Sequence, residues 1–361
     1  MLYKQGWLLL IMLACTAVAG GQHAAMQAAV DSAVAKGFSG VVLVAKNGKP
    51  VLKAVHGYRH FETKELLQFD DVFELASVSK QFTAMMMMMM AEEGKLRYDD
   101  TVGRYISLPY PGITIRHLLT HTSGLPDYQA VMDAHWDKQK IAGNDDCIHL
   151  LCKYAPPALF APGEQYAYSN TGYLLLASIA EKASGEDFID LMRRRIFKPL
   201  RMRHTDIRTL EAKAAMVNFA AGHMKDFLGE YVNANKFRSS DYTVWLGNRK
   251  GPGRISSTAT DLLRWDRALY KQKLVSNATL SQAFSATKLS SGQLSDYGFG
   301  WDLEQHPQLG RIVKHNGDNP GYSTQIIRCI DKRYTIIVLC NNAHATFSTL
   351  VAALVAALAA A

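Results

Sequence analysis

The stretch GVVLVAKNGKPVLKAV, residues 40–55, decides the fold class of this chain. Two apolar runs, Gly40–Ala45 and Val51–Val55, flank the turn residues Asn47 and Gly48. Apolar runs on either side of an Asn-Gly pair predict a β-hairpin. A sheet is therefore expected to begin near the N-terminus.

The other strand signals lie at the opposite end of the chain. They are the β-like runs Tyr297–Leu303, Arg311–Lys314, Ser323–Cys329 and Tyr334–Leu339. Apolar spacing predicts helices at Ala24–Ala35, Ser77–Glu93, Thr171–Ala183, Phe188–Arg195 and Thr260–Tyr270. The segment Leu96–Lys250 carries helix and loop signals and no convincing run of strands.

Strands at both ends with helices between them predict an α+β (α/β) fold in which both ends of the chain build one sheet domain. The expected sheet domain comprises residues 20–95 and 254–361. An all-helical domain, residues 96–253, is inserted between these two parts.

The composition is that of a globular protein, with 48% hydrophobic and 20% charged residues among 361. The net charge of +8 comes from Lys and Arg spread along the chain, and no nucleic-acid motif accompanies them. We therefore expect a solvated basic surface and no nucleic-acid partner. Such a surface would keep an exported protein near an anionic envelope.

Residues 1–19 resemble a secretory signal. Lys4 supplies the positive start, Leu8–Cys15 the apolar stretch and Ala17–Ala19 a small-residue cleavage site. The sequence thus predicts export to the periplasm or the exterior, with a mature chain that begins near Gly20. Lipid attachment at Cys15 is the less favoured alternative, because the residues before it fit a lipid-attachment box poorly.

Two further apolar segments are assigned to the core rather than to a membrane or a metal site. The run Phe347–Ala361 is shorter than a membrane span, so we expect a helix packed on the sheet instead of an anchor. Six consecutive methionines, Met85–Met90, favour core packing over a metal or redox tract, because thioethers fill irregular gaps and suit helices.

No cofactor or metal is predicted. His117 and His121 are four residues apart but lack the glutamate of a zinc-protease helix. No dinucleotide loop, Walker loop or G-x-S-x-G elbow occurs. The later cysteines, Cys147, Cys152, Cys329 and Cys340, lack zinc spacing, and their disulfide pairing is not readable from the sequence.

The first candidate for chemistry is the S-x-x-K motif Ser77-Val-Ser-Lys80, at the start of a predicted helix. Residues three apart share one helix face, so Lys80 can reach the Ser77 hydroxyl. If burial lowers the pKa of Lys80, it can take the serine proton. The motif alone is weak, since Ser285-Ala-Thr-Lys288 matches it as well.

Two later motifs supply the other candidates. Tyr168-Ser-Asn170 offers a phenol that could act as a base and an amide that can donate or accept, although Tyr231-Val-Asn233 matches the same pattern. His315-Asn-Gly317 follows a predicted strand, where a substrate could lie along a sheet edge. His315 could donate to a substrate oxygen or to Tyr168.

The order S-x-x-K, Y-x-N, H-x-G resembles the serine beta-lactamase and penicillin-binding-protein superfamily, in particular the class C beta-lactamase, DD-peptidase and esterase branch. Four longer sequence segments show the same resemblance: LASVSKQFT at 75–83, IRHLLTHTSGLP at 115–126, PGEQYAYSNTGY at 162–173 and HNGDNPGY at 315–322. The resemblance covers nearly all of the mature chain. It implies an antiparallel sheet flanked by N- and C-terminal helices, with an inserted helical domain.

The resemblance also implies a role for each matching residue. Ser77 would be the nucleophile, and Lys80 and Tyr168 would transfer protons. The substrate-binding set would be Asn170, His315, Gly317 and Asp318, with the backbone amides of Ser77 and Asp318 as oxyanion hole. His315 stands where beta-lactamases usually have lysine, a departure that favours a peptidase or esterase over an efficient beta-lactamase.

These observations predict a secreted serine hydrolase that acts through an acyl-enzyme and needs no metal or cofactor. The substrate would be a small molecule or peptide with an amide or ester, such as a cell-wall D-amino-acid peptide, a small ester or a β-lactam. A penicillin-binding or sensor protein that is acylated with little turnover is the main alternative. A catalytically silent scaffold is disfavoured, because every reactive position keeps its reactive residue type. The oligomeric state stays open.

Overall fold

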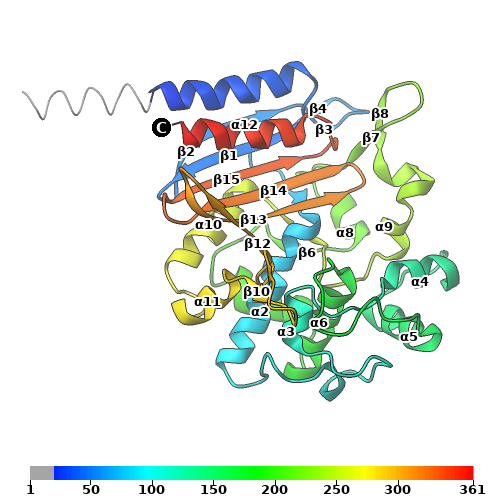
Figure 1. Cartoon of the computed structure of the whole chain (residues 1–361). Helices are drawn as coiled ribbons and strands as arrows, with labels where there is room; N and C mark the ends of the chain where they lie inside the picture. Colours follow the sequence, from blue (N-terminus) through cyan, green and yellow to red (C-terminus); the bar gives the residue numbers. More distant parts are fainter. Residues whose placement is uncertain (1–19, 361) are drawn as a thin grey trace, which may run out of the picture.

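The computed structural model describes residues 20–360 and contains one large antiparallel sheet (Figure 1). Its strand order is β12-β13-β14-β15-β1-β2. The strands are β1 (Gly40–Lys46), β2 (Lys49–His56), β12 (Asp302–His306), β13 (Gly310–Asn319), β14 (Tyr322–Cys329) and β15 (Tyr334–Cys340). The predicted N-terminal hairpin is thus confirmed, and its strand β1 pairs with β15 from the C-terminal part of the chain.

Two helices from the opposite ends of the described chain cover one face of this sheet. They are residues 20–35 and α12 (Phe347–Ala359), which lie next to each other above the sheet in Figure 1. The buried apolar residues of α12 on this side are Phe347, Leu350, Leu354, Ala357 and Leu358. The C-terminal apolar run is therefore a packed helix, as expected. No helix within residues 20–360 is long and apolar enough to cross a membrane.

The other face of the sheet carries α10 (Ala259–Tyr270), which packs on β1 and β15, and the 3-10 helix Ala76–Ser79 that leads into α2 (Lys80–Glu92). Helix α11 (Asn277–Ala283) packs on α2. Helix α2 is buried on all its sides, and the exposed fractions of Met85–Met90 range from 0% to 8%. The methionine tract is therefore core packing, as predicted. This burial fixes the start of α2 between the sheet and the remaining helices.

The middle of the chain is mostly helical. Its helices are α3 (Ile115–Leu119), α4 (Tyr128–His135), α5 (Asn144–Tyr154), α6 (Asn170–Ser184), α7 (Phe188–Met192), α8 (Leu210–Ala214) and α9 (Tyr242–Trp245). The segment contains no long run of strands, as expected, but it is not entirely helical, because it also holds three short strands: β6 (Asp206–Ile207), β7 (His223–Lys225) and β8 (Tyr231–Asn233). Strands of two or three residues are too short to show a period of two in the sequence.

Short strands also tie the middle segment to the rest of the fold. β6 and β5 (Phe73–Glu74) pair with opposite edges of β9 (Ile255–Ser257). The remaining short strands are β3 (Tyr58–His60), β4 (Glu65–Leu66), β10 (Thr287–Lys288) and β11 (Leu294–Ser295). Strand β5 lies directly before the S-x-x-K motif, so the small β5-β9-β6 sheet helps to place Ser77.

The strand predicted at 297–303 begins only at Asp302. The preceding residues form an irregular turn that packs tightly against the backbone of another segment. A Cβ at Gly298 would lie 1.9 Å from the Ala283 carbonyl oxygen, and Gly300 has a φ of +80°. An extended strand cannot follow that path. The strand predicted at 311–314 instead continues through Asn319, so the His315 motif lies inside β13 rather than after it.

The four cysteines in the described part of the chain are free thiols, and three of them, Cys147, Cys329 and Cys340, are buried. The predicted signal segment 1–19, including Cys15, lies outside the described residues.

Candidate active site

Ser77 and Lys80 meet at the start of the buried helix. Ser77 lies in a short 3-10 helix, Ala76–Ser79, that runs directly into α2. The Nζ of Lys80 is 3.0 Å from the Oγ of Ser77. Ala76 adopts a φ of 48°, a strained conformation for alanine that holds Ser77 in place at the junction.

Lys80 is fully buried and has two further polar contacts. Its Nζ lies 2.8 Å from Oδ1 of Asn170 and 2.9 Å from the carbonyl oxygen of Pro252. Burial, and then the positive charge of Arg249, hold the pKa of Lys80 well below its usual value. A neutral amine has two N–H groups, and each donates a hydrogen bond to one of these oxygens, of Asn170 and Pro252. Its lone pair is then left to face the Ser77 hydroxyl.

Tyr168 covers the other side of Lys80. Its ring centroid lies 4.7 Å from the Lys80 Nζ, and 44% of the residue is exposed. Burial of its hydroxyl end raises the pKa of Tyr168 far above that of a free phenol, so this side chain is a protonated donor. The sequence leaves open whether Tyr168 or Lys80 is the base, and the directions of their pKa shifts favour Lys80 in that role.

His315 makes different contacts from those expected. Its Nε2 lies 2.9 Å from the hydroxyl of Tyr297, and its Nδ1 lies 2.6 Å from the carbonyl oxygen of Asn316. A carbonyl can only accept, so Nδ1 carries the proton and Nε2 accepts from Tyr297. Burial and then the charge of Lys80 lower the pKa of His315 to about 3. The neutral ring therefore has no N–H left for Tyr168 or a substrate, contrary to expectation.

Gly317 brings the edge of β13 against the nucleophile. A Cβ at this position would lie 2.2 Å from the Leu75 carbonyl oxygen and 3.0 Å from the Ser77 nitrogen. Only glycine fits between these backbone atoms. Asp318 follows with an exposed side chain that accepts a hydrogen bond from Nδ2 of Asn316 at 2.8 Å.

His121 is a central residue of the site that the sequence did not predict, since it was considered there only as a possible metal ligand. It is fully buried, and its Nδ1 accepts a hydrogen bond of 3.0 Å from the Ser169 amide. Its ring lies 4.3 Å from the Tyr168 ring and 4.5 Å from the Tyr297 ring, measured between centroids. Burial, followed by the charge of Lys80, keeps the pKa of His121 well below its usual value. His121 thus orients Tyr168 without adding charge.

The two competing motif matches lie elsewhere. The Ser285 hydroxyl donates to the Ser281 carbonyl at 2.7 Å, and Tyr231 lies on β8 beneath Lys225. Neither match pairs its residues as Ser77 and Lys80 are paired. Within residues 20–360, no group of three or more His, Cys, Asp or Glu side chains is placed to hold a metal ion.

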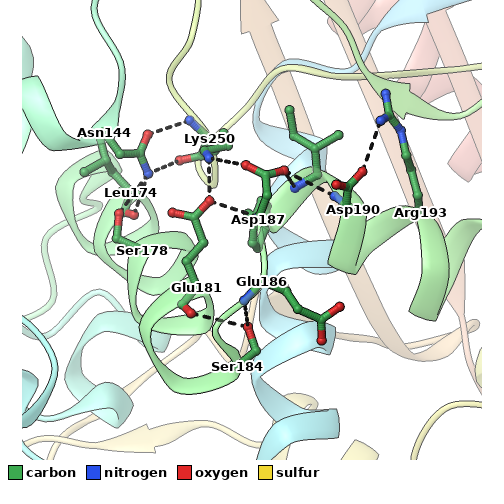
Figure 2. A network of polar contacts seen from close by, with 12 residues as sticks. Asn144, Leu174, Ser178, Glu181, Ser184, Glu186, Asp187, Asp190, Arg193 and Lys250 are labelled. Carbon is green, nitrogen blue, oxygen red and sulfur yellow. Dashed lines mark hydrogen bonds and ion pairs between the residues drawn. The ribbon is translucent and has the colours of Figure 1, made fainter.

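A polar network holds the loop that contacts Lys80 (Figure 2). The Nδ2 of Asn144 donates to the carbonyls of Leu174 and Lys250 and to the Ser178 hydroxyl, each at 3.1 Å. Its Oδ1 accepts from the Lys250 amide at 2.7 Å. The ammonium of Lys250 also pairs with Glu181 and Asp187. Because Pro252 is two residues further on, the network fixes its carbonyl relative to α6.

Asn144→Ala is expected to lower the free energy of unfolding by about 2–4 kcal/mol, because it leaves several buried polar groups without partners. Urea unfolding followed by circular dichroism measures this change. Ser178→Ala removes one of the same hydrogen bonds and should cost only about 1 kcal/mol. Equal losses in the two variants would show that the network around Asn144 does not act as described.

This arrangement defines a serine hydrolase: an antiparallel sheet, a buried helix that begins with a serine–lysine pair, and a tyrosine beside them. A family model described as Beta-lactamase matches residues 26–361, and the chain belongs to that family.

Individual relatives are consistent with this class. Penicillin-binding protein 4* of Bacillus subtilis is 42% identical over 312 residues, which cover 86% of this chain and 69% of that protein. D-aminopeptidase of Brucella canis is 26% identical over 308 residues, 85% of this chain but only 57% of the relative. The solved D-amino acid amidase of Ochrobactrum anthropi shares the fold, with a TM-score of 0.75 at 22% identity, over 93% of this chain and 98% of that one.

Proposed function

We propose that this hydrolase cleaves amide bonds next to D-amino acid residues through an acyl-enzyme on Ser77. The observation that carries the proposal is the buried Lys80, whose two N–H groups are taken by Asn170 and Pro252 and whose lone pair faces Ser77 Oγ. Such a lysine can act as a general base at neutral pH.

The proposed reaction has two halves. Ser77 Oγ attacks the substrate carbonyl while its proton passes to the Nζ of Lys80, giving a tetrahedral intermediate. Tyr168 then protonates the leaving amine through its hydroxyl and regains a proton from Lys80. The C–N bond breaks, and an ester remains on Ser77. Water, deprotonated by the same pair, hydrolyses that ester and restores the serine.

The oxyanion would bind the backbone amides of Ser77 and Asp318. The turn Pro320–Gly321 closes the β13–β14 hairpin with Asn319 opposite Tyr322. In an antiparallel ladder, alternate residues point their N–H groups away from the partner strand. If the pair that closes the hairpin is hydrogen-bonded, Asp318 directs its amide to the free edge of β13, beside Ser77.

The substrate class follows from two considerations. Relatives named D-aminopeptidase and penicillin-binding protein 4* match this chain over most of its length. The neutral His315, bonded to Tyr297, supplies no cation for the carboxylate of a β-lactam. We therefore infer that D-amino-acid amides and peptides are turned over faster than β-lactams. A β-lactam would acylate Ser77, and the resulting acyl-enzyme would be hydrolysed slowly.

Export is a separate proposal that rests on the sequence of residues 1–19, with its basic start, apolar stretch and small-residue end. Expression of the full chain with a C-terminal tag would test it. N-terminal sequencing of the secreted or periplasmic form should then begin near Gly20.

The substrate proposal is tested with D- and L-alanyl p-nitroanilide at equal concentrations, alongside benzylpenicillin followed by intact mass. We expect hydrolysis of the D-enantiomer at least about tenfold faster than of the L-enantiomer, and a penicillin adduct that persists for minutes. Preference for the L-enantiomer would refute the substrate class. A persistent adduct without turnover of either amide would instead indicate an acylated sensor protein.

A further inference from the structure

A cavity lies next to the proposed oxyanion hole. Its volume is about 490 Å³, and the residues that line it include Glu74, Lys213, Arg254, Phe219, Asn319 and Tyr322. Glu74 precedes Ser77 by three residues, and Asn319 directly follows Asp318. The cavity therefore begins beside both ends of the proposed oxyanion hole, although Ser77, Lys80 and Tyr168 do not line it.

The buried charges around this cavity are unbalanced. Lys213 forms a buried ion pair with Glu74. Arg254 is 2% exposed, donates to the carbonyls of Thr243 and Gly247, and has an Nε without a hydrogen-bond partner. Arg249 is also buried, donates to the hydroxyl of Tyr128 and lies close enough to Glu74 for its charge to lower the pKa of that carboxyl.

Three buried cations thus share one buried carboxylate. Within residues 20–360, neither arginine of this cluster forms an ion pair. Glu211 also lines the cavity, but it is exposed at the surface, where water screens its charge. Buried charge without a counter-ion is costly, and an anion in the adjacent cavity would supply the missing negative charge.

The position of Tyr168 tells which part of a substrate reaches the cavity. The Tyr168 ring lies 6.2 Å from the His315 ring, so the leaving group that Tyr168 protonates belongs at the His315 side of Gly317. Asn319 and Pro320, which line the cavity, lie on the other side of Gly317. The acyl part of the substrate is therefore the part that extends into it.

We propose that the cavity of Lys213 and Arg254 is a subsite for a carboxylate carried by the acyl part of the substrate. This inference rests on the acyl-enzyme function proposed above. Phe219 and Tyr322 supply apolar walls for the chain that bears the carboxylate, and Tyr322 is held by a hydrogen bond of 2.9 Å to the Ala220 carbonyl. The subsite would select acidic peptides over their neutral counterparts.

The pKa of Lys213 is consistent with a site that attracts an anion. Burial lowers the pKa of Lys213 to about 8 despite its ion pair with Glu74, and the charge of Arg254 contributes to the decrease. A bound carboxylate would oppose this effect.

The test compares N-succinyl-D-alanyl p-nitroanilide with its neutral isostere, in which the succinyl carboxylate is an amide. We expect a kcat/KM about tenfold higher for the carboxylate, the value of one charged hydrogen bond. Arg254→Gln should bring the ratio close to one. The matched control Arg311→Gln, at an exposed residue paired with Asp331 on the far end of β13, should keep the wild-type ratio.

A second variant and a binding measurement test the subsite even if Arg254→Gln does not fold. If Arg254→Gln folds poorly, Lys213→Met serves instead, because it frees Glu74 to balance Arg254 and should reduce the ratio several-fold. Free succinate should raise the melting temperature of the wild type more than chloride at equal ionic strength, and this difference should vanish in the variant.

A wild-type ratio near one, or a preference that survives both substitutions, would overturn the subsite. If neither anilide is hydrolysed and penicillin gives no adduct, the acyl-enzyme function itself fails. The succinate measurement then tests separately whether the cavity binds a carboxylate. If succinate does not raise the melting temperature above that of the chloride control, the cavity is not an anion site.

Discussion

Ser77→Ala is expected to lower kcat/KM for a D-amino-acid anilide by about 10⁴-fold or more, since loss of a nucleophile removes the covalent route entirely. The penicillin adduct should disappear from the intact mass spectrum as well. Helix α2 is enclosed by core residues, and alanine at position 77 removes only a hydroxyl, so the melting temperature should change little.

Ser285→Ala is the matched control for this experiment. Ser285 begins the competing S-x-x-K match, but its hydroxyl donates only to the Ser281 carbonyl within the same turn of chain. Its loss should leave turnover within about twofold of wild type, as is usual for surface substitutions. Activity that survives Ser77→Ala and is lost in Ser285→Ala would overturn the whole assignment of the site.

Lys80→Arg should lower kcat by about 10³-fold, although it keeps a long basic side chain at this position, because a guanidinium stays protonated and cannot accept the serine proton. Lys80→Met should cause a similar loss, since it removes the amine altogether. Steady-state kinetics and the rate of penicillin acylation measure both effects. An active Lys80→Arg enzyme would exclude Lys80 as the base.

The pH profile of the wild type gives an independent reading of the same residue. The base form of Lys80 is the neutral one, so activity rises as pH increases through the lowered pKa of this lysine and is already on its plateau far below the pH at which a free lysine loses its proton. An acidic limb that reached its plateau only near pH 10 would show that Lys80 titrates as an ordinary lysine.

Much of this site could be predicted from the sequence, because its interacting residues lie close together along the chain. Ser77 and Lys80 meet because they stand three residues apart at a helix start, and the six methionines that follow show that the helix is buried. The N-terminal hairpin and the C-terminal strands were equally visible, since each is long enough to show its own pattern.

Contacts between segments far apart in the sequence could not be predicted. Tyr297 lies in a stretch that resembled a strand, yet two close glycine contacts bend it so that its hydroxyl meets His315. The charge of Arg249 lowers the pKa of Lys80, and the charge of Lys80 lowers that of His121, in both cases across the fold and not through any spacing along the chain. Such residues carry no sequence pattern of their own, because a histidine or arginine in a loop more often serves only structure.

The methionines of α2 also provide a built-in chemical probe. Peroxide oxidises a thioether only where it can reach the sulfur, and Met85–Met90 are nearly closed to solvent. Each sulfoxide adds one oxygen to the mass, so the rate at which a peptide containing these residues gains oxygen would measure how often the helix behind the nucleophile is uncovered. A time course of mass spectra would thus measure how often the core opens, without any label.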